Sequence, residues 1–400
     1  MKTTVAAIDF GTSKIVTLVA ENSGSQRCDI VGAGIAEYDG YMLDGWNDPA
    51  NVTEKIQQSI AEAEKQSHRR LREINVGVPG AFTRVDVTEV RIPLTGPDPK
   101  VTPADVKNIF DQAAKKLGTQ PGGIVIHSSP AWFMVDNHKK TLEPVGMKGR
   151  ELSALISFVS AEKFFVDEVN GRLNSLGIAA SGFYSAPAGE AMLYLPEEDR
   201  DRTAVLIDMG YLNTEVMIVE GDAIIYHKVI EMGGGNIAAD LSIGLGVNIN
   251  AAEEKIKQQY VFNSVVAQEN SFTIPGVDGQ KPMTFTREQV QQIIEPRVEE
   301  IAEAIQAALD DSGVQLGNWS NIYLTGGGLA FNRGGRDFLS KKLVRTVRDT
   351  PKRTTKMTSH AFSSTLGLMD LIIDTIEQNR QPSGGVGGGV MNFFRSLLGG

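Results

Sequence analysis

The sequence is short of cysteine and of long apolar runs, and each shortage excludes a class of protein. Its single cysteine, Cys28, rules out an internal disulfide and fits a reducing compartment. No stretch of about 18 apolar residues is free of charge, so no transmembrane helix is expected. The apolar run after Met1 is interrupted by Asp9 and Lys14, which is unlike a signal peptide.

Positive charge is also scarce, since 39 basic residues face 49 acidic ones, and the net charge of −10 argues against a nucleic-acid binder. Glycine is abundant instead, at 42 of 400 residues, where about 7% is usual. At about 150 residues per domain the length predicts two or three folded units. These averages predict a soluble, cytosolic α/β protein with a glycine-rich end.

A strand, polar turn and strand occur twice, about 199 positions apart. In the first copy, strands 4–8 and 15–20 enclose the turn Asp9-Phe10-Gly11-Thr12-Ser13-Lys14. In the second copy, the turn that starts Asp208-Met209-Gly210 lies between strands 204–207 and 216–219. A third strand follows each copy, at 30–37 in the first and at 223–230 in the second. Repetition on this scale predicts two similar halves that face each other.

Such turns suit phosphate and metal binding. Glycine lets backbone N–H groups at Gly11–Lys14 close around an anion, and Thr12 and Ser13 add hydroxyl donors. Asp9 and Asp208, approaching from opposite halves, could hold a hydrated Mg²⁺. The alternative is that Asp-x-Gly is only a tight turn, but a second copy in an equivalent place favours the binding site.

Two more glycine clusters, residues 325–328 and 233–236, each follow a predicted strand and precede a predicted helix. Four glycine turns at strand ends can converge on one nucleotide between two halves. The sequence has neither a G-x-x-x-x-G-K-[ST] loop nor a G-x-G-x-x-G fingerprint, which weighs against P-loop and Rossmann folds.

The pattern resembles the actin-like ATPase superfamily, and within it the FtsA family of bacterial cell-division proteins. Stretches outside the nucleotide motifs carry this finer resemblance, namely Gly45-Trp46-Asn47-Asp48, Glu143-Pro144-Val145-Gly146-Met147-Lys148-Gly149 and Ile294-Glu295-Pro296-Arg297. It extends from about residue 4 to the C-terminus. The resemblance implies an actin-like fold of two duplicated, ribonuclease-H-like halves with an inserted α+β subdomain.

The resemblance also implies a site for ATP and Mg²⁺. Asp9 and Asp208 would hold Mg²⁺ through water. The residues that would bind ATP are Gly11, Thr12, Ser13, Lys14, Gly210, Asn213, Thr214, Gly233, Gly234, Asn236, Glu254, Lys257, Gly326, Gly327 and Gly328.

Two departures from the family pattern bear on hydrolysis. Tyr211-Leu212 interrupts a second phosphate loop that usually reads Gly-Gly-Gly-Thr. In addition, no glutamate or glutamine stands before Pro187, where other members of the superfamily place residues that orient water. Nucleotide binding is therefore expected, with hydrolysis weak or absent, and no catalytic residue is assigned.

The expected division of the chain follows the repeat. The first half comprises 1–83 and 159–200, with the inserted subdomain at 84–158. The second half comprises 201–230 and 319–382, with an outer subdomain at 231–318. The resemblance implies that this outer subdomain binds the C-terminal tail of FtsZ. Thr102 should cap a helix over 103–117, and Thr286 should open a long helix that Pro296 kinks. The basic stretch 333–356 is either a solvated face or a lipid-facing surface.

A glycine-rich tether at 383–389 leads to a short amphipathic segment at 390–400. Apolar side chains on one helical face beside a cation favour insertion at a bilayer surface over docking in a groove. The predicted membrane residues are Val390, Met391, Phe393, Phe394, Arg395, Leu397 and Leu398.

The resemblance, together with the amphipathic tail, implies a polymerising adaptor that tethers FtsZ filaments to the cytoplasmic face of the membrane at the division septum. Its expected partners are the FtsZ tail, copies of itself, later division proteins and anionic lipids, but not nucleic acid. An actin-like scaffold of type IV pilus assembly and a soluble small-molecule kinase are the alternatives.

Overall fold

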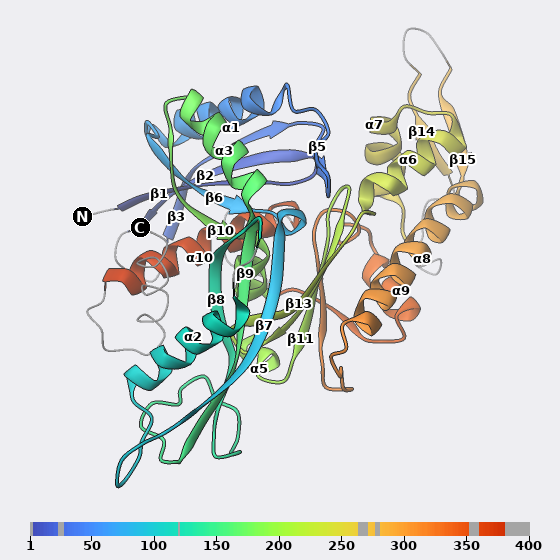
Figure 1. Cartoon of the computed structure of the whole chain (residues 1–400). Coiled ribbons are helices and arrows are strands. Elements are labelled where there is room, and N and C mark those ends of the chain that lie inside the picture. Colours follow the sequence, from blue (N-terminus) through green and yellow to red (C-terminus); the bar gives the residue numbers. More distant parts are fainter. Residues whose placement is uncertain are drawn as a thin grey trace.

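The computed structural model describes residues 3–22, 28–118, 121–262, 271–276, 281–351 and 360–380. Two halves stand side by side in it, each built on a five-stranded sheet (Figure 1). The tether and the predicted membrane residues lie outside the described residues. Among the helices that are described, none is long and apolar enough to cross a membrane.

The first sheet has the order β3-β2-β1-β6-β10. Its strands are β1 (Thr3–Phe10), β2 (Lys14–Asn22), β3 (Cys28–Glu37), β6 (Glu73–Val78) and β10 (Ala179–Ser185). The first three form an antiparallel meander, and β6 and β10 add in parallel. Helices α1 (Val52–Ser67) and α3 (Lys163–Ser175) bury their apolar sides against this half.

The second sheet repeats this plan in the order β13-β12-β11-β16-β17. Its strands are β11 (Ala204–Met209), β12 (Thr214–Glu220), β13 (Ala223–Ile230), β16 (Ile322–Thr325) and β17 (Val347–Asp349). Again three strands form an antiparallel meander and two add in parallel. The predicted duplication is therefore confirmed at the level of sheet topology.

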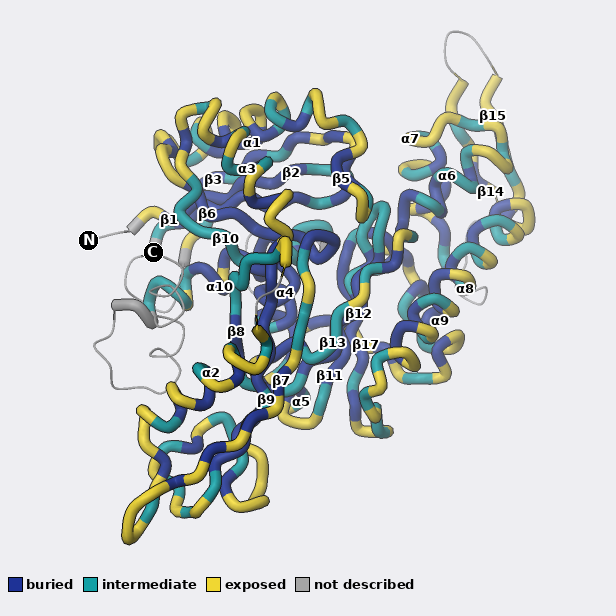
Figure 2. Tube along the Cα trace, in the orientation of Figure 1, coloured by how far each residue is buried: buried dark blue, intermediate teal, exposed yellow. Residues whose placement is uncertain are grey.

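The insertion forms its own layer of three strands, β7 (Thr83–Pro93), β8 (Gly123–Val135) and β9 (Glu151–Glu162), with β9 in the middle. Helix α2 (Pro103–Leu117) covers it, with the predicted Thr102 cap in place. The far end of this subdomain is largely exposed (Figure 2). Its near end touches the second half, where the hydroxyl of Ser157 donates to the carbonyl of Ile224 at 2.6 Å.

The outer part of the second half consists of α6 (Gly234–Leu245), α7 (Ile249–Ala251), the hairpin β14 (Ser271–Ile274) and β15 (Met283–Thr286), and α8 (Arg287–Asp311). Thr286 and Gln289 form the predicted capping box of α8, which runs on through Pro296 as one helix. The chain closes with α9 (Gly335–Lys342) and α10 (Ser363–Arg380), and α10 returns to the first half (Figure 1).

Candidate functional site

A cavity of about 880 Å³ lies between the two halves. Both hairpin turns line it, together with the start of α4 (Ala186–Tyr194), the glycine turn after β16 and the first residues of α10. The predicted site residues in its wall are Asp9, Gly11, Thr12, Ser13, Lys14, Asp208, Gly210, Asn213, Glu254, Gly326 and Gly327. Segments more than 300 residues apart in sequence thus meet at one site.

Aromatic hydroxyls hold the first turn in place. The Gly11 N–H donates to the Lys14 carbonyl at 3.0 Å and closes the turn. The Tyr38 hydroxyl donates to the carbonyl of Gly11 at 2.7 Å, and that of Tyr41 to the carbonyl of Phe10 at 3.0 Å. These contacts occupy the two carbonyls and the Gly11 N–H, while Thr12, Ser13 and Lys14 line the cavity and can offer donors to an anion there.

Backbone groups hold the second turn. The Gly210 N–H donates to the Asn213 carbonyl at 2.9 Å, as in the first turn. The N–H groups that open α6 then donate to this turn, from Gly234 to the Gly210 carbonyl at 2.9 Å and from Gly235 to the Tyr211 carbonyl at 2.6 Å. The predicted residues Thr214, Gly233, Gly234, Asn236 and Gly328 stand behind the cavity wall and support it.

The two turns touch each other across the cavity. The Leu212 N–H donates to Oγ1 of Thr12 at 2.9 Å. Leu212 belongs to the dipeptide that departs from the usual glycine-rich loop. A backbone N–H within this dipeptide therefore makes a direct contact between the two halves at the cavity.

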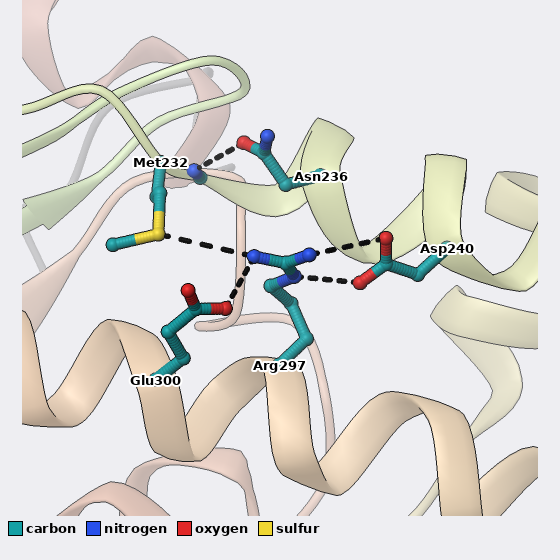
Figure 3. Close-up of polar contacts among 6 residues, drawn as sticks. Met232, Asn236, Asp240, Arg297 and Glu300 are labelled. Atoms are coloured by element: carbon teal, nitrogen blue, oxygen red, sulfur yellow. Dashed lines mark hydrogen bonds and ion pairs between the residues drawn. The ribbon is translucent and has the colours of Figure 1, made fainter.

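Figure 3 shows how Arg297 of α8 anchors the middle of α6. The Arg297 guanidinium binds both carboxylate oxygens of Asp240, at 2.6 and 3.2 Å, and also contacts Glu300. One turn earlier on α6, the Asn236 side chain accepts the Gly233 N–H at 2.9 Å. Arg297, part of one of the stretches that suggested the family, thus fixes the helix whose first amides support the second turn.

Lys257 does not reach the cavity. Its side chain is 2% exposed, and its Nζ binds the Glu253 carboxylate at 2.8 and 3.0 Å. Glu253 and Glu254 both line the cavity instead. A role for Lys257 in contacting the nucleotide stays a prediction, and its contacts in the structure are those of a support for Glu253.

The glycine turn after β16 forms the opposite wall. Gly326 has φ +87°, and a Cβ there would lie 2.1 Å from Oδ1 of Asp208, so only glycine fits. Phe331, which sequence reasoning missed, also lines the cavity and is 45% exposed. Its ring edge faces Gly327, and a flat aromatic side chain beside flat backbone suits the stacking of a base.

The wall of the cavity contains buried carboxyl groups. Asp9 is 4% exposed and accepts the Thr365 hydroxyl at 2.8 Å, and burial raises its pKa. Burial, with Glu215 nearby, raises the pKa of Asp208 to about 7. Glu190 on α4, a second residue that the sequence did not single out, is 2% exposed and contacts Asp208. Burial raises its pKa well above the usual value.

The residues present fit a hydrated cation. Oδ1 of Asp208 is buried in the described structure without a hydrogen-bond partner. Across the described residues, no three His, Cys, Asp or Glu side chains are arranged to hold a metal ion directly. A cation between Asp9 and Asp208 would keep its water, as Mg²⁺ often does.

Two sequence profiles match this chain. "Cell division protein FtsA" matches residues 205–367, and "SHS2 domain inserted in FTSA" matches residues 80–160. Among curated relatives, the cell division protein FtsA of Escherichia coli is 23% identical over 91% of this chain and 89% of its own length. The cell division protein FtsA of Neisseria meningitidis is 24% identical over 97% of this chain and 96% of its own length.

Solved structures agree on the fold. A PilM-PilN type IV pilus biogenesis complex matches with a TM-score of 0.59 at 15% identity, over 91% of this chain and 97% of that one. MreB5 of Spiroplasma citri bound to ADP matches with a TM-score of 0.57 at 11% identity, over 94% of this chain and 98% of that one. With its two like sheets and its SHS2 insertion, the chain belongs to the FtsA family of cell-division proteins, within the actin-like ATPases.

Proposed function

We propose that this protein is an ATP-binding, polymerising adaptor that tethers FtsZ filaments to the cytoplasmic face of the membrane at the division septum and recruits later division proteins. The observation that carries the proposal is the single cavity lined by both hairpin turns and by the glycine turn after β16. The family indicates the biological setting, and the cavity offers a site where a bound ligand can hold the two halves together.

In this proposal the two turns bind the phosphates of ATP from opposite sides. Backbone N–H groups of the first turn, the Thr12 and Ser13 hydroxyls and Lys14 face the cavity from one half. Lys14 is held within reach because its Nζ lies 4.5 Å from the centre of the Phe362 ring. Asp9 and Asp208 would orient the water shell of Mg²⁺, which supplies the positive charge that the phosphates need.

The adenosine end would lie between the glycine turn and the α7 region. Gly326 and Gly327 offer flat backbone, Phe331 a ring face, and Glu254 a carboxylate for hydroxyl groups. Because no glutamate or glutamine stands before Pro187, we propose that ATP acts mainly as an assembly ligand. MreB5 of Spiroplasma citri, which shares the fold, was solved with ADP and with AMPPNP.

The proposed membrane contact is the tail at 390–400. Burying six apolar side chains would yield about 9 to 18 kcal/mol at most. Ordering nine residues at about 1.5 kcal/mol each opposes most of that gain. One copy should therefore bind weakly, whereas a polymer that presents many copies would bind through avidity.

Co-sedimentation with liposomes tests this function. The full chain, with Mg-ATP, should sediment with anionic vesicles and carry FtsZ into the pellet. A chain that lacks 390–400 should stay in the supernatant and still bind ATP. Equal sedimentation of the two chains would contradict the anchor, and capture of a pilus-type peptide in place of the FtsZ tail would favour the pilus scaffold.

A further inference from the structure

Carboxyl groups outnumber lysines among the described residues that line the cavity. Eight carboxyl side chains line it, against only two lysines. At the phosphate end stand Asp9, Glu190, Asp208 and Glu215, with Lys14 as the nearby cation. A bare polyphosphate would be repelled at this end, because like charges interact strongly where burial lowers the effective dielectric.

Glu190 is held rigidly at this end. Helices α4 and α10 approach so closely that a Cβ on Gly189 would lie 2.5 Å from the Gly367 carbonyl oxygen. A Cβ on Gly367 would lie 2.4 Å from the Glu190 Cα. The backbone of Glu190 therefore has no room to shift, and its side chain, 2% exposed, lies in the cavity wall.

Two carboxylate oxygens in this wall lack partners. Glu190 contacts Asp208 and Ser363. Its Oε1 nevertheless has no hydrogen-bond partner among the residues described, and neither has Oδ1 of Asp208. A buried polar atom without a partner is costly, and more so when it carries charge. Since both oxygens belong to groups in one cavity wall, a positively charged ligand with several O–H donors would satisfy both.

We propose that Glu190 joins Asp9 and Asp208 as a third carboxylate around a hydrated divalent cation, and thereby makes nucleotide binding depend on that cation. Water bridges the carboxylates to the cation, since no three of these side chains are arranged to bind it directly within the described structure. The inference deepens the proposed function and rests on it. A purely structural Glu190 would give nucleotide affinities that shift equally with and without the cation.

The test is a cycle of ATP affinities measured with Mg²⁺ and with EDTA. In the wild type, Mg²⁺ should strengthen binding. In Glu190→Gln, which keeps the shape of the side chain, this gain should shrink by about tenfold, the lower range for losing a group in a metal's outer shell. In EDTA the same variant should bind ATP at least as tightly as the wild type, because without the cation the substitution removes no favourable contact with the nucleotide.

Asp39→Asn is the matched control. Asp39 also lines the cavity but is exposed, and its carboxylate accepts from the Asn51 side-chain amide at 3.5 Å. The substitution therefore replaces a carboxylate by an amide outside the buried cluster. Mg²⁺ should strengthen ATP binding by Asp39→Asn as much as it strengthens ATP binding by the wild type. An unchanged gain in Glu190→Gln, or an equal loss with and without Mg²⁺, would overturn the proposal.

A second measurement separates this inference from the proposed function. Mn²⁺ binding to the nucleotide-free protein, followed by the loss of the free-ion EPR signal, needs no nucleotide. Wild type and Asp39→Asn should bind Mn²⁺ alike, and Glu190→Gln about tenfold more weakly. If the wild type binds Mn²⁺ in this way but no ATP, the nucleotide function fails while the cation site stands. Equal Mn²⁺ binding by all three proteins would overturn the site.

Discussion

The two hairpins have the same turn but different supports. Each turn closes with a hydrogen bond from a glycine N–H to the carbonyl three residues on, at Gly11 and at Gly210. The hydroxyls of Tyr38 and Tyr41, in the segment that follows β3, hold the first. Backbone N–H groups at the start of α6 hold the second.

The two halves therefore share their strands and their turn as a result of the duplication. In each half, however, a different neighbouring segment holds the turn in position. Side-chain support can be removed one hydroxyl at a time. Backbone support depends on space, because α6 begins against the second turn and leaves no room for a side chain. Substitutions should therefore damage the second turn more than the first.

Adding one methyl group to the start of α6 should have the largest effect. A Cβ on Gly234 would lie 2.6 Å from the Gly328 Cα and 2.7 Å from Nζ of Lys257. Gly234→Ala should lower ATP affinity about a hundredfold and reduce the unfolding temperature by several degrees, as overpacking costs about 1 to 3 kcal/mol.

The control for that substitution is Gly327→Ala. Its Cβ would lie 3.5 Å from the Phe331 ring, an ordinary contact. Gly327→Ala should therefore leave the unfolding temperature unchanged in thermal denaturation of the nucleotide-free protein. An equal drop for both variants would show that the start of α6 is not specially constrained.

Breaking the contact between the turns should have the next largest effect. Thr12→Val keeps the shape of the side chain but removes the acceptor of the Leu212 N–H. Losing such a partner costs about 1 to 3 kcal/mol, so ATP affinity measured by titration should fall about tenfold. Thr12→Ser retains the hydroxyl and should restore most of the affinity. Equal losses in the two variants would rule out this hydrogen bond as the cause.

Removing the aromatic supports of the first turn should cost less. Tyr41→Phe and Tyr38→Phe each delete one hydroxyl that donates to a carbonyl. We expect each to lower the free energy of unfolding by about 1 kcal/mol, measured by urea denaturation. A loss as large as that of Gly234→Ala would contradict the difference between side-chain and backbone support.

The pH dependence of stability gives a separate test of the buried carboxyl groups. The pKa of Asp208 is about 7 in the fold, above the ordinary 3.8. The folded state therefore binds more protons than the unfolded state between those values, and stability falls as pH rises through that window. In EDTA, the unfolding temperature of Asp208→Asn should decline less from pH 5 to 8 than that of the wild type. Parallel curves would contradict the raised pKa.

The sequence predicted the elements of the site better than their contacts. Asp9 and Asp208 lie at the ends of β1 and β11, and the glycine turn follows β16, so repeat and spacing were enough to bring them together. Glu190 lies inside a helix, and nothing local shows that its side chain reaches the cavity. Only the close packing of α4 on α10, set by glycines 178 positions apart, places it there.

Phe331 and Lys257 show the same limit. Phe331 stands three residues after the glycine run, where an apolar residue is also typical of a helix core. Lys257 matched a family position by spacing, yet the turn of π-helix over Ala252–Ile256 directs its side chain to Glu253. Local pattern identifies the chemistry of a residue, and tertiary packing decides which way it points.

Calorimetric titration of the nucleotide-free protein with Mg-ATP tests most directly whether the two turns bind one nucleotide between them. The wild type should show saturable binding of one ATP per chain, and Gly234→Ala should lose it although its first turn is intact. Absence of saturable binding in the wild type, or equal binding in Gly234→Ala, would contradict a site built from both halves.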